Sequence, residues 1–211
     1  MRRLPVYILI ETAGGMRGER IQAVTNGLEV MVSSLRQNPF ALESVYISLI
    51  TFNKDAKTIT PLTGLDAIQI PDISIPVSSP PHTGQALEYL CNQVDKDLIK
   101  NNGDEKGDWR PLLFILTRGV PADKQKYHNV ISLVKNKNFA TIVACSAGST
   151  KSESELKLLT EHIVHLETAD KNTLSSFFNW VSSSIGVGNL SSSSNSSVNL
   201  PPPPKEVQIV L

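Results

Sequence analysis

The chain lacks the features that define several classes of protein. Only two cysteines occur among its 211 residues, Cys91 and Cys145, and no CxxC or CxxH spacing indicates a zinc site or a disulfide framework. The 20 basic and 20 acidic side chains cancel, so the chain has no overall attraction to nucleic acid or to anionic membranes. No apolar run approaches the roughly 18 residues of a membrane-spanning helix. We therefore expect two buried thiols in a reducing compartment.

The N-terminal segment does not resemble a secretory signal either. Its apolar run, Val6–Ile10, follows two arginines but is too short for the hydrophobic region of a signal peptide, and it stops at Glu11. We expect a cytoplasmic protein. No Ser-His-Asp or Cys-His arrangement can be assembled from the sequence, so we expect no catalytic residues.

What the chain does have is a regular alternation of strand-like and helix-like segments. Val6–Ile10 is apolar at every position, which is typical of a strand covered on both faces. From Glu19 to Gln37, apolar residues recur at spacings of three and four and form one helical stripe. The further expected strands are 44–53, 58–62, 111–117, 140–145 and 162–166, and the further expected helices are 83–100, 122–135, 152–160 and 172–185.

This order predicts an α/β, Rossmann-like fold with a central, mostly parallel six-stranded sheet and helices on both faces. The turn between the strands 44–53 and 58–62 has only about four residues, which is enough for a hairpin alone. The sheet should therefore carry one antiparallel edge strand.

The composition changes after Ile185. The stretch GVGNLSSSSNSSVN is typical of a flexible linker, and LPPPP (Leu200–Pro204) favours polyproline II. The last residues, KEVQIVL (Lys205–Leu211), would form a strand if a sheet edge were available. We predict a domain over 1–185 and a flexible Ser/Asn/Pro-rich tail over 186–211. Whether the end of the tail is disordered or docks as a strand on this domain or on a partner stays open.

Three segments follow the carboxyl ends of predicted strands, where open α/β sheets bind ligands: Glu11–Gly15, the loop before Thr83, and Thr117–Gly119. The first segment contains Ala13, Gly15 and Gly18 at the spacing of a GxGxxG phosphate-binding turn whose first glycine is replaced. A nucleotide-binding protein that uses the Ala13–Gly18 turn is therefore one alternative. Its signal is weak, because the second strand does not end in an acidic residue.

Five stretches that cover essentially Arg2 to Ile185 carry a more specific signal: RRLPVYILIETAGGMRGERIQAVTNGL, SSLRQNPFALESVYISLITF, GDWRPLLFILTRGVPAD, IVACSAGS and TADKNTLSSFFNWVSSSI. They resemble the von Willebrand factor A (vWA) domain and, more narrowly, the TerY-like proteins associated with bacterial tellurite resistance. The resemblance implies a non-catalytic protein–protein interaction module in tellurite resistance or a related stress response. It also implies protein partners, namely other tellurite-resistance proteins and kinase- or phosphatase-like components, rather than nucleic acid or a membrane.

Typical vWA domains hold a divalent cation in a metal-ion-dependent adhesion site, formed by D-x-S-x-S, a threonine and an aspartate from three loops. At these positions the chain has Glu11, Ala13, Gly15, Thr83 and Arg118. Both serine hydroxyls are missing, and a guanidinium cannot lose its proton to ligate Mg²⁺. The resemblance therefore implies a degenerate site with no cofactor. Residual Mg²⁺ or Mn²⁺ binding by Glu11 and Thr83 with water, in a metal-dependent adhesion domain, is the other alternative.

We expect Arg118 and Glu11 to project from adjacent strands into one crevice and to pair there, the guanidinium taking the place of the ion. Ala13 and Gly15 would clear space for that guanidinium. The expected partner-binding crevice comprises Glu11, Thr12, Gly14, Met16, His82, Thr83 and Arg118.

Overall fold

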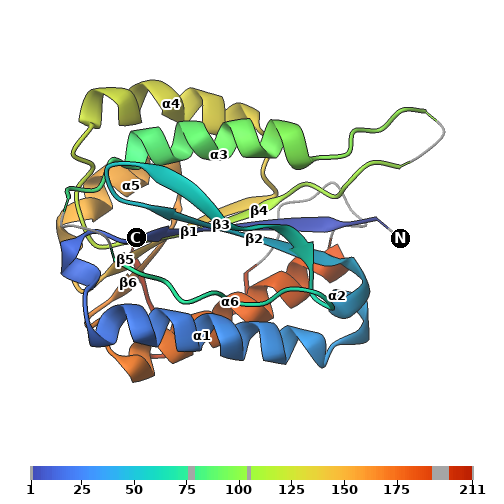
Figure 1. Ribbon diagram of the computed structural model, residues 1–211, viewed down its shortest axis with the longest axis horizontal. Helices are drawn as coiled ribbons and strands as arrows, with labels where there is room; N and C mark the ends of the chain where they lie inside the picture. Colours follow the sequence, from blue (N-terminus) through green and yellow to red (C-terminus); the bar gives the residue numbers. More distant parts are fainter. Residues whose placement is uncertain (1, 76–78, 104–105, 192–199, 211) are drawn as a thin grey trace.

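A computed structural model of the chain describes residues 2–75, 79–103, 106–191 and 200–210. Its strands are β1 (Leu4–Glu11), β2 (Val45–Phe52), β3 (Ala56–Gly64), β4 (Leu112–Thr117), β5 (Thr141–Ala147), β6 (His162–Leu166) and β7 (Gln208–Val210). Its helices are α1 (Glu19–Arg36), α2 (Pro39–Ser44), α3 (Thr83–Asp97), α4 (Lys124–Asn136), α5 (Glu153–Leu159) and α6 (Lys171–Ser191), with short 3₁₀ helices η1 (Gly14–Met16) and η2 (Thr150–Ser152). The sheet lies between two layers of helices, with α3 and α4 on one side and α1 and α6 on the other (Figure 1).

The sheet has the spatial order β3-β2-β1-β4-β5-β6-β7. The five strands from β2 to β6 in this order pair in parallel, which confirms the mostly parallel α/β fold. The hairpin of β2 and β3 is antiparallel, as expected. The expected number of six strands is wrong, because the sheet has seven. The additional strand, β7, pairs antiparallel with β6 at the opposite edge, where Ile163 lies opposite Val210.

Alternate residues of the central strands supply two separate cores. On β1, Val6, Ile8 and Ile10 face the cluster that contains the apolar stripes of α1 and α6. Tyr7 and Leu9 face the other cluster, which contains the apolar residues of α3 and α4. Because successive side chains of a strand point to opposite faces, a strand buried between two helical layers must be apolar throughout. Because β1 and β4 pair in parallel between these cores, both strands end at the same edge of the sheet.

Both cysteines are buried free thiols, as predicted. Cys91 belongs to the core beneath α3 and Cys145 to the core beneath α1 and α6, so the sheet separates them. Burial raises the pKa of the Cys91 thiol to about 11, and it raises the pKa of Cys145 well above its ordinary value. Such thiols are protonated at neutral pH and react slowly.

The last helix continues past its expected end at Ile185, because α6 runs to Ser191, and the division into a domain over 1–185 and a tail over 186–211 stays a prediction. A glycine such as Gly186 lowers helix stability by only about 1 kcal/mol, which is too little by itself to end a helix. The linker-like residues 192–199 lie outside the described part of the chain. Of the helices that the structure describes, none is long and apolar enough to cross a membrane.

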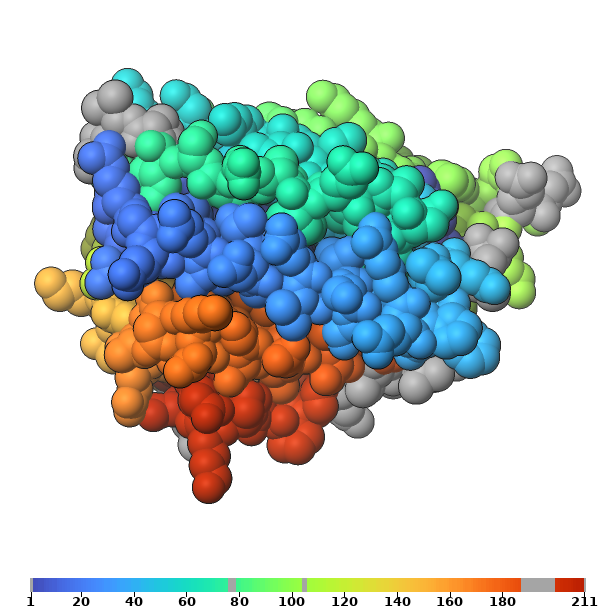
Figure 2. All heavy atoms as spheres, turned by 60° about the horizontal axis from the view of Figure 1, so that its bottom comes forward, coloured from blue at the N-terminus to red at the C-terminus, as the bar shows by residue number. Residues whose placement is uncertain are grey.

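The segment after this gap returns to the domain. The indole Nε1 of Trp180 donates a hydrogen bond to the carbonyl of Pro201 at 2.9 Å, and Val207 is only 2% exposed within the core. Figure 2 shows the C-terminal residues, in red, beside α6. The end of the tail therefore docks on its own domain in this structure, which selects one of the outcomes that the sequence left open.

Candidate functional site

The loops after β1 and β4 meet at the carboxyl edge of the sheet, because these strands are neighbours in the parallel register. A hollow of about 690 Å³ opens there, which we call the edge crevice. Its walls are residues 13–15, 79–81, 118–119 and 148–149, together with Glu11 and Lys151. The crevice thus forms where the sequence predicts it, at the ends of the central strands.

Glu11, the last residue of β1, is almost fully enclosed, with 2% of its surface exposed. Its Oε2 accepts three hydrogen bonds, from the Thr117 hydroxyl at 2.6 Å, the Arg118 backbone N–H at 2.8 Å and the Gly119 backbone N–H at 3.0 Å. Backbone N–H groups that converge on a carboxylate fix the turn that carries them. Glu11 therefore joins the end of β1 to the loop after β4.

The Arg118 guanidinium turns away from this carboxylate. Its Nη1 donates to the carbonyl oxygen of Gly15 at 3.1 Å, and no ion pair joins Arg118 to Glu11. The expected side-chain pair is therefore wrong: the two residues meet through the Arg118 backbone instead. The physical reason is that the Thr117 hydroxyl and two backbone N–H groups bind Oε2, while the guanidinium finds an acceptor in the Gly15 carbonyl.

Gly15 makes room for the Arg118 side chain. A Cβ at Gly15 would lie only 3.0 Å from Nη1, whereas a Cβ at Gly148 would be at ordinary contact distance, 3.6 Å from Nε. The expectation that Gly15 clears space for the guanidinium is thus confirmed. The Nε atom is buried and has no hydrogen-bond partner among the described residues.

The other expected crevice residues are divided between the wall and the interior. Gly14 lines the hollow, and His82 is half-buried at the start of α3. Thr12 is 3% exposed and its hydroxyl donates to the carbonyl of Phe52. Met16 is 0% exposed and packs in the core beneath α1. Its assignment to the crevice is therefore wrong, because η1 directs this side chain inward.

Thr83 begins α3 and is 1% exposed, and its Oγ1 has no hydrogen-bond partner in the described part of the chain. The adjoining N–H groups are satisfied differently. Asp123 accepts hydrogen bonds from Gly84 N at 3.1 Å and Gln85 N at 2.8 Å. Sequence reasoning missed this contact, because Asp123 falls inside the expected helix 122–135 and no local pattern links it to residues 84 and 85.

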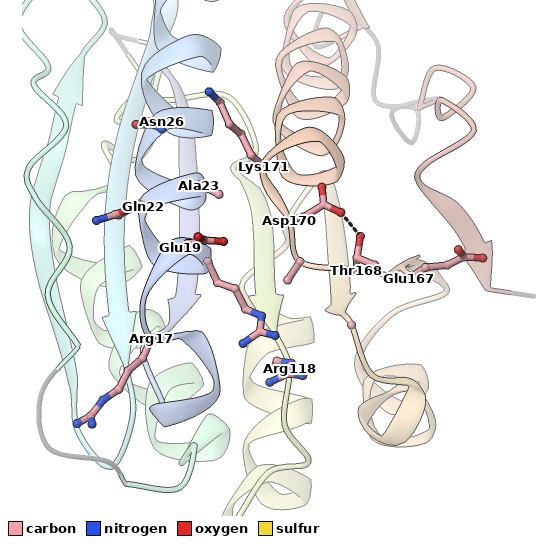
Figure 3. A pocket seen from close by; sticks show the side chains of 13 residues that line it. Arg17, Glu19, Gln22, Ala23, Asn26, Arg118, Glu167, Thr168, Asp170 and Lys171 are labelled. Carbon is pink, nitrogen blue, oxygen red and sulfur yellow. Dashed lines mark hydrogen bonds between the residues drawn. The ribbon is translucent and has the colours of Figure 1, made fainter.

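A second hollow of about 670 Å³ lies between the first turns of α1 and α6 (Figure 3). We call it the α1–α6 pocket, and its walls include Glu19, Arg20, Arg118, Lys171 and the segment 167–170. The sequence analysis did not identify Arg20, because a basic residue on an exposed helix turn is common and does not by itself indicate a binding site. Its Nη1 donates at 3.2 Å to the same Gly15 carbonyl that Arg118 uses.

Comparisons with known proteins agree with the fold. The von Willebrand factor type A domain matches residues 6–179. The PilB minor pilin from Streptococcus sanguinis has a TM-score of 0.68 at 10% identity, over 87% of this chain and 61% of that chain. Proximal thread matrix protein 1 from the mussel byssus, with a zinc-occupied MIDAS motif, has a TM-score of 0.66 at 15% identity, over 90% of this chain and 46% of that one.

A von Willebrand factor type A protein from Catenulispora acidiphila has a TM-score of 0.63 at 13% identity, over 87% of this chain and 42% of that chain. This chain spans about half of the length of such structures. At these identities the similarity concerns the fold alone. No curated protein matches the chain.

Proposed function

This chain belongs to the von Willebrand factor type A family, a family of protein-interaction and adhesion modules, and we propose that it binds a protein partner at the edge crevice without a metal ion and without catalysis. The observation that carries the proposal is the state of Glu11. Its Oε2 holds the loop after β4 through three hydrogen bonds. That oxygen is engaged by protein donors, where a metal site would direct it at an ion.

The donor set around the crevice fits a divalent cation poorly. Mg²⁺ prefers several hard oxygen ligands in octahedral geometry. Ala13 and Gly15 offer no side-chain oxygen, and the permanent charge of Arg118 repels a dication. Among the described residues, no group of three or more His, Cys, Asp or Glu side chains is arranged to hold a metal. The chemistry of the residues therefore supports partner binding by hydrogen bonds and by the guanidinium itself.

The biological setting of the proposal follows from the sequence motifs that resemble TerY-like proteins, such as GDWRP and FFNWVS. We place the chain in a bacterial tellurite-resistance or stress-response system in the cytoplasm. Its partners would be other tellurite-resistance proteins and kinase- or phosphatase-like components.

Thr83 favours a second candidate function, a metal-dependent adhesion domain. A buried hydroxyl without a partner costs free energy unless something else binds it, and Thr83 Oγ1 is such an atom among the described residues. In that case Glu11 and Thr83, with water, would hold the cation. The nucleotide-binding alternative has weaker support, because β2 is followed by Asn53 and not by an acidic residue that could bind a ribose.

Partner capture separates the two candidates. The full chain carrying an affinity tag would be purified from its native cells in chelator and in Mg²⁺, alongside Arg118→Asp and Lys135→Gln. Lys135, in the last turn of α4, lies in the helical layer on the other side of the sheet from α1 and controls for the loss of a basic side chain remote from the crevice. We expect the same partners in both buffers, their loss in Arg118→Asp and their retention in Lys135→Gln. Release of partners by chelator would contradict the proposal and favour the metal-dependent domain.

A further inference from the structure

The α1–α6 pocket contains two guanidinium groups on one acceptor. The Nη1 atoms of Arg20 and Arg118 lie 3.2 and 3.1 Å from the carbonyl oxygen of Gly15. Neither side chain forms an ion pair with a carboxylate in the part of the chain that the structure describes. Like charges held this close repel one another, and a single neutral carbonyl offsets little of that repulsion. The arrangement has the chemistry of an anion site.

Other features of the pocket add to the positive charge or lie apart from it. Lys171, in the first turn of α6, lines the pocket, but in Figure 3 its side chain extends away from Arg118. The N-terminus of α1 opens at the pocket. Its N-cap residue, Gly18, has no side chain that could accept hydrogen bonds from the first backbone N–H groups of the helix. Arg118 adds the buried Nε that has no partner among the described residues. Two guanidinium groups and the N-terminus of α1 therefore contribute positive potential at this end of the pocket.

The acidic residues of the pocket are mostly engaged elsewhere. Asp170 accepts hydrogen bonds from the Thr168 hydroxyl at 2.5 Å and from Thr173 N at 3.0 Å, at the start of α6. Glu167 accepts from Gln208 at 2.9 Å and points toward the C-terminal strand in Figure 3. Glu19 is the exception, because its carboxylate is directed between the two helices. It is an exposed competitor for the arginines that a stronger anion would displace.

We propose that the α1–α6 pocket binds an oxyanion, a phosphate or carboxylate group carried by a protein partner, held between Arg20 and Arg118. Guanidinium groups suit this ligand because each presents several donors in one plane and binds two oxygens at once. The pocket and the edge crevice share Arg118 and Gly148, so one partner would span both. The inference rests on the proposed function for the nature of the partner, and it adds the recognised group.

The first test is a titration of the ¹⁵N-labelled full chain with inorganic phosphate at constant ionic strength, followed through the arginine Nε–Hε signals. We expect the signals of Arg20 and Arg118 to shift together and to saturate. Arg20→Gln, an exposed position, should weaken binding about tenfold, the effect of losing one charge-assisted contact. Lys135→Gln should leave it unchanged, and Glu19→Gln should strengthen it. Equal shifts with chloride, or an affinity that Arg20→Gln leaves intact, would overturn the inference.

Peptides then identify the source of the oxyanion. A short Gly/Ser peptide with one phosphoserine, the same peptide with glutamate in its place, and the unmodified peptide would be compared by fluorescence anisotropy. Binding of the first alone assigns phosphate, and binding of both charged peptides assigns oxyanions in general. Equal binding of all three, or of none, contradicts the inference.

Arg20 keeps the two proposals distinguishable, because it lines the α1–α6 pocket and not the edge crevice. If Arg20→Gln still captures the cellular partners at full yield, the oxyanion inference fails while the proposed function stands. If phosphate binds as expected but Arg118→Asp captures the same partners as the unaltered chain, the proposed function fails.

Discussion

Removing the Glu11 carboxylate should cost the protein a large part of its stability. Each hydrogen bond to a charged acceptor contributes about 1.5–3 kcal/mol, and Oε2 accepts three of them with only 2% of the residue exposed. The gross sum is about 4.5–9 kcal/mol, of which water entering the vacated space recovers a part. We therefore expect Glu11→Ala to lower the free energy of unfolding by about 3–5 kcal/mol, against a typical total of about 5–15 kcal/mol.

Two further variants make the prediction specific. Glu11→Gln keeps an oxygen where Oε2 lies but removes its charge, so we expect a smaller loss of about 1–2 kcal/mol. Glu11→Asp withdraws the carboxylate by one methylene from the N–H groups of Arg118 and Gly119, and it should be more destabilising than Glu11→Gln.

Urea unfolding followed by circular dichroism, in chelator and in millimolar Mg²⁺, measures these differences. If Glu11 is a structural acceptor, the order of stability is the same in both buffers. A Glu11→Ala variant within about 1 kcal/mol of the unaltered chain would refute the reasoning, since three charged hydrogen bonds cannot be lost so cheaply. So would stabilisation of Glu11→Asp by Mg²⁺ alone, because that is the behaviour of a metal ligand.

Other predictions concern packing, the tail and pH. Gly27→Ala should destabilise by about 1–3 kcal/mol in thermal unfolding, because its Cβ would lie 2.3 Å from the Phe178 ring, whereas Gly186→Ala, with nothing within 4 Å, should stabilise slightly. Trp180→Phe removes the bond to Pro201 and should speed amide exchange in β7 about tenfold while exchange in β1 is unchanged; equal protection of β7 would contradict the docking. The Thr168 hydroxyl and the Thr173 N–H hold the pKa of Asp170 below its usual range. A carboxyl whose pKa is lower in the folded state stabilises the fold above its unfolded pKa, and this stabilisation is lost as the pH falls through the folded pKa. Asp170→Ala should therefore lower the free energy of unfolding by about 0.5–1 kcal/mol at neutral pH and by less below about pH 4. A difference in unfolding free energy that does not change with pH would disprove this.

The central fold was predictable because its signals are local and strong. A run such as Val6–Ile10, apolar at every position, is compatible only with burial on both faces, and the short turn before β3 admits only a hairpin. The strands β1 and β4 then had to end at one edge, which located the crevice. The helix α2 was missed because it has six residues, although the Asn38 side chain accepts hydrogen bonds from Phe40 N and Ala41 N.

The contacts within the site were less predictable, for a physical reason. Glu11 and Arg118 both find backbone partners, two N–H groups for the carboxylate and the Gly15 carbonyl for the guanidinium. Every residue carries such groups, so no residue type marks them in a sequence. Charge alone suggested that the two side chains pair with each other. The strand β7 was left open for a related reason, since three residues, Gln208–Val210, form a strand only where an edge such as β6 accepts them.

The most direct test of the account is a calorimetric titration of Mn²⁺ into the metal-free full chain at neutral pH. The account predicts no saturable heat of binding, because Arg118 and the engaged Glu11 leave no competent set of ligands. Saturable binding with micromolar affinity, abolished in Thr83→Val, would contradict it.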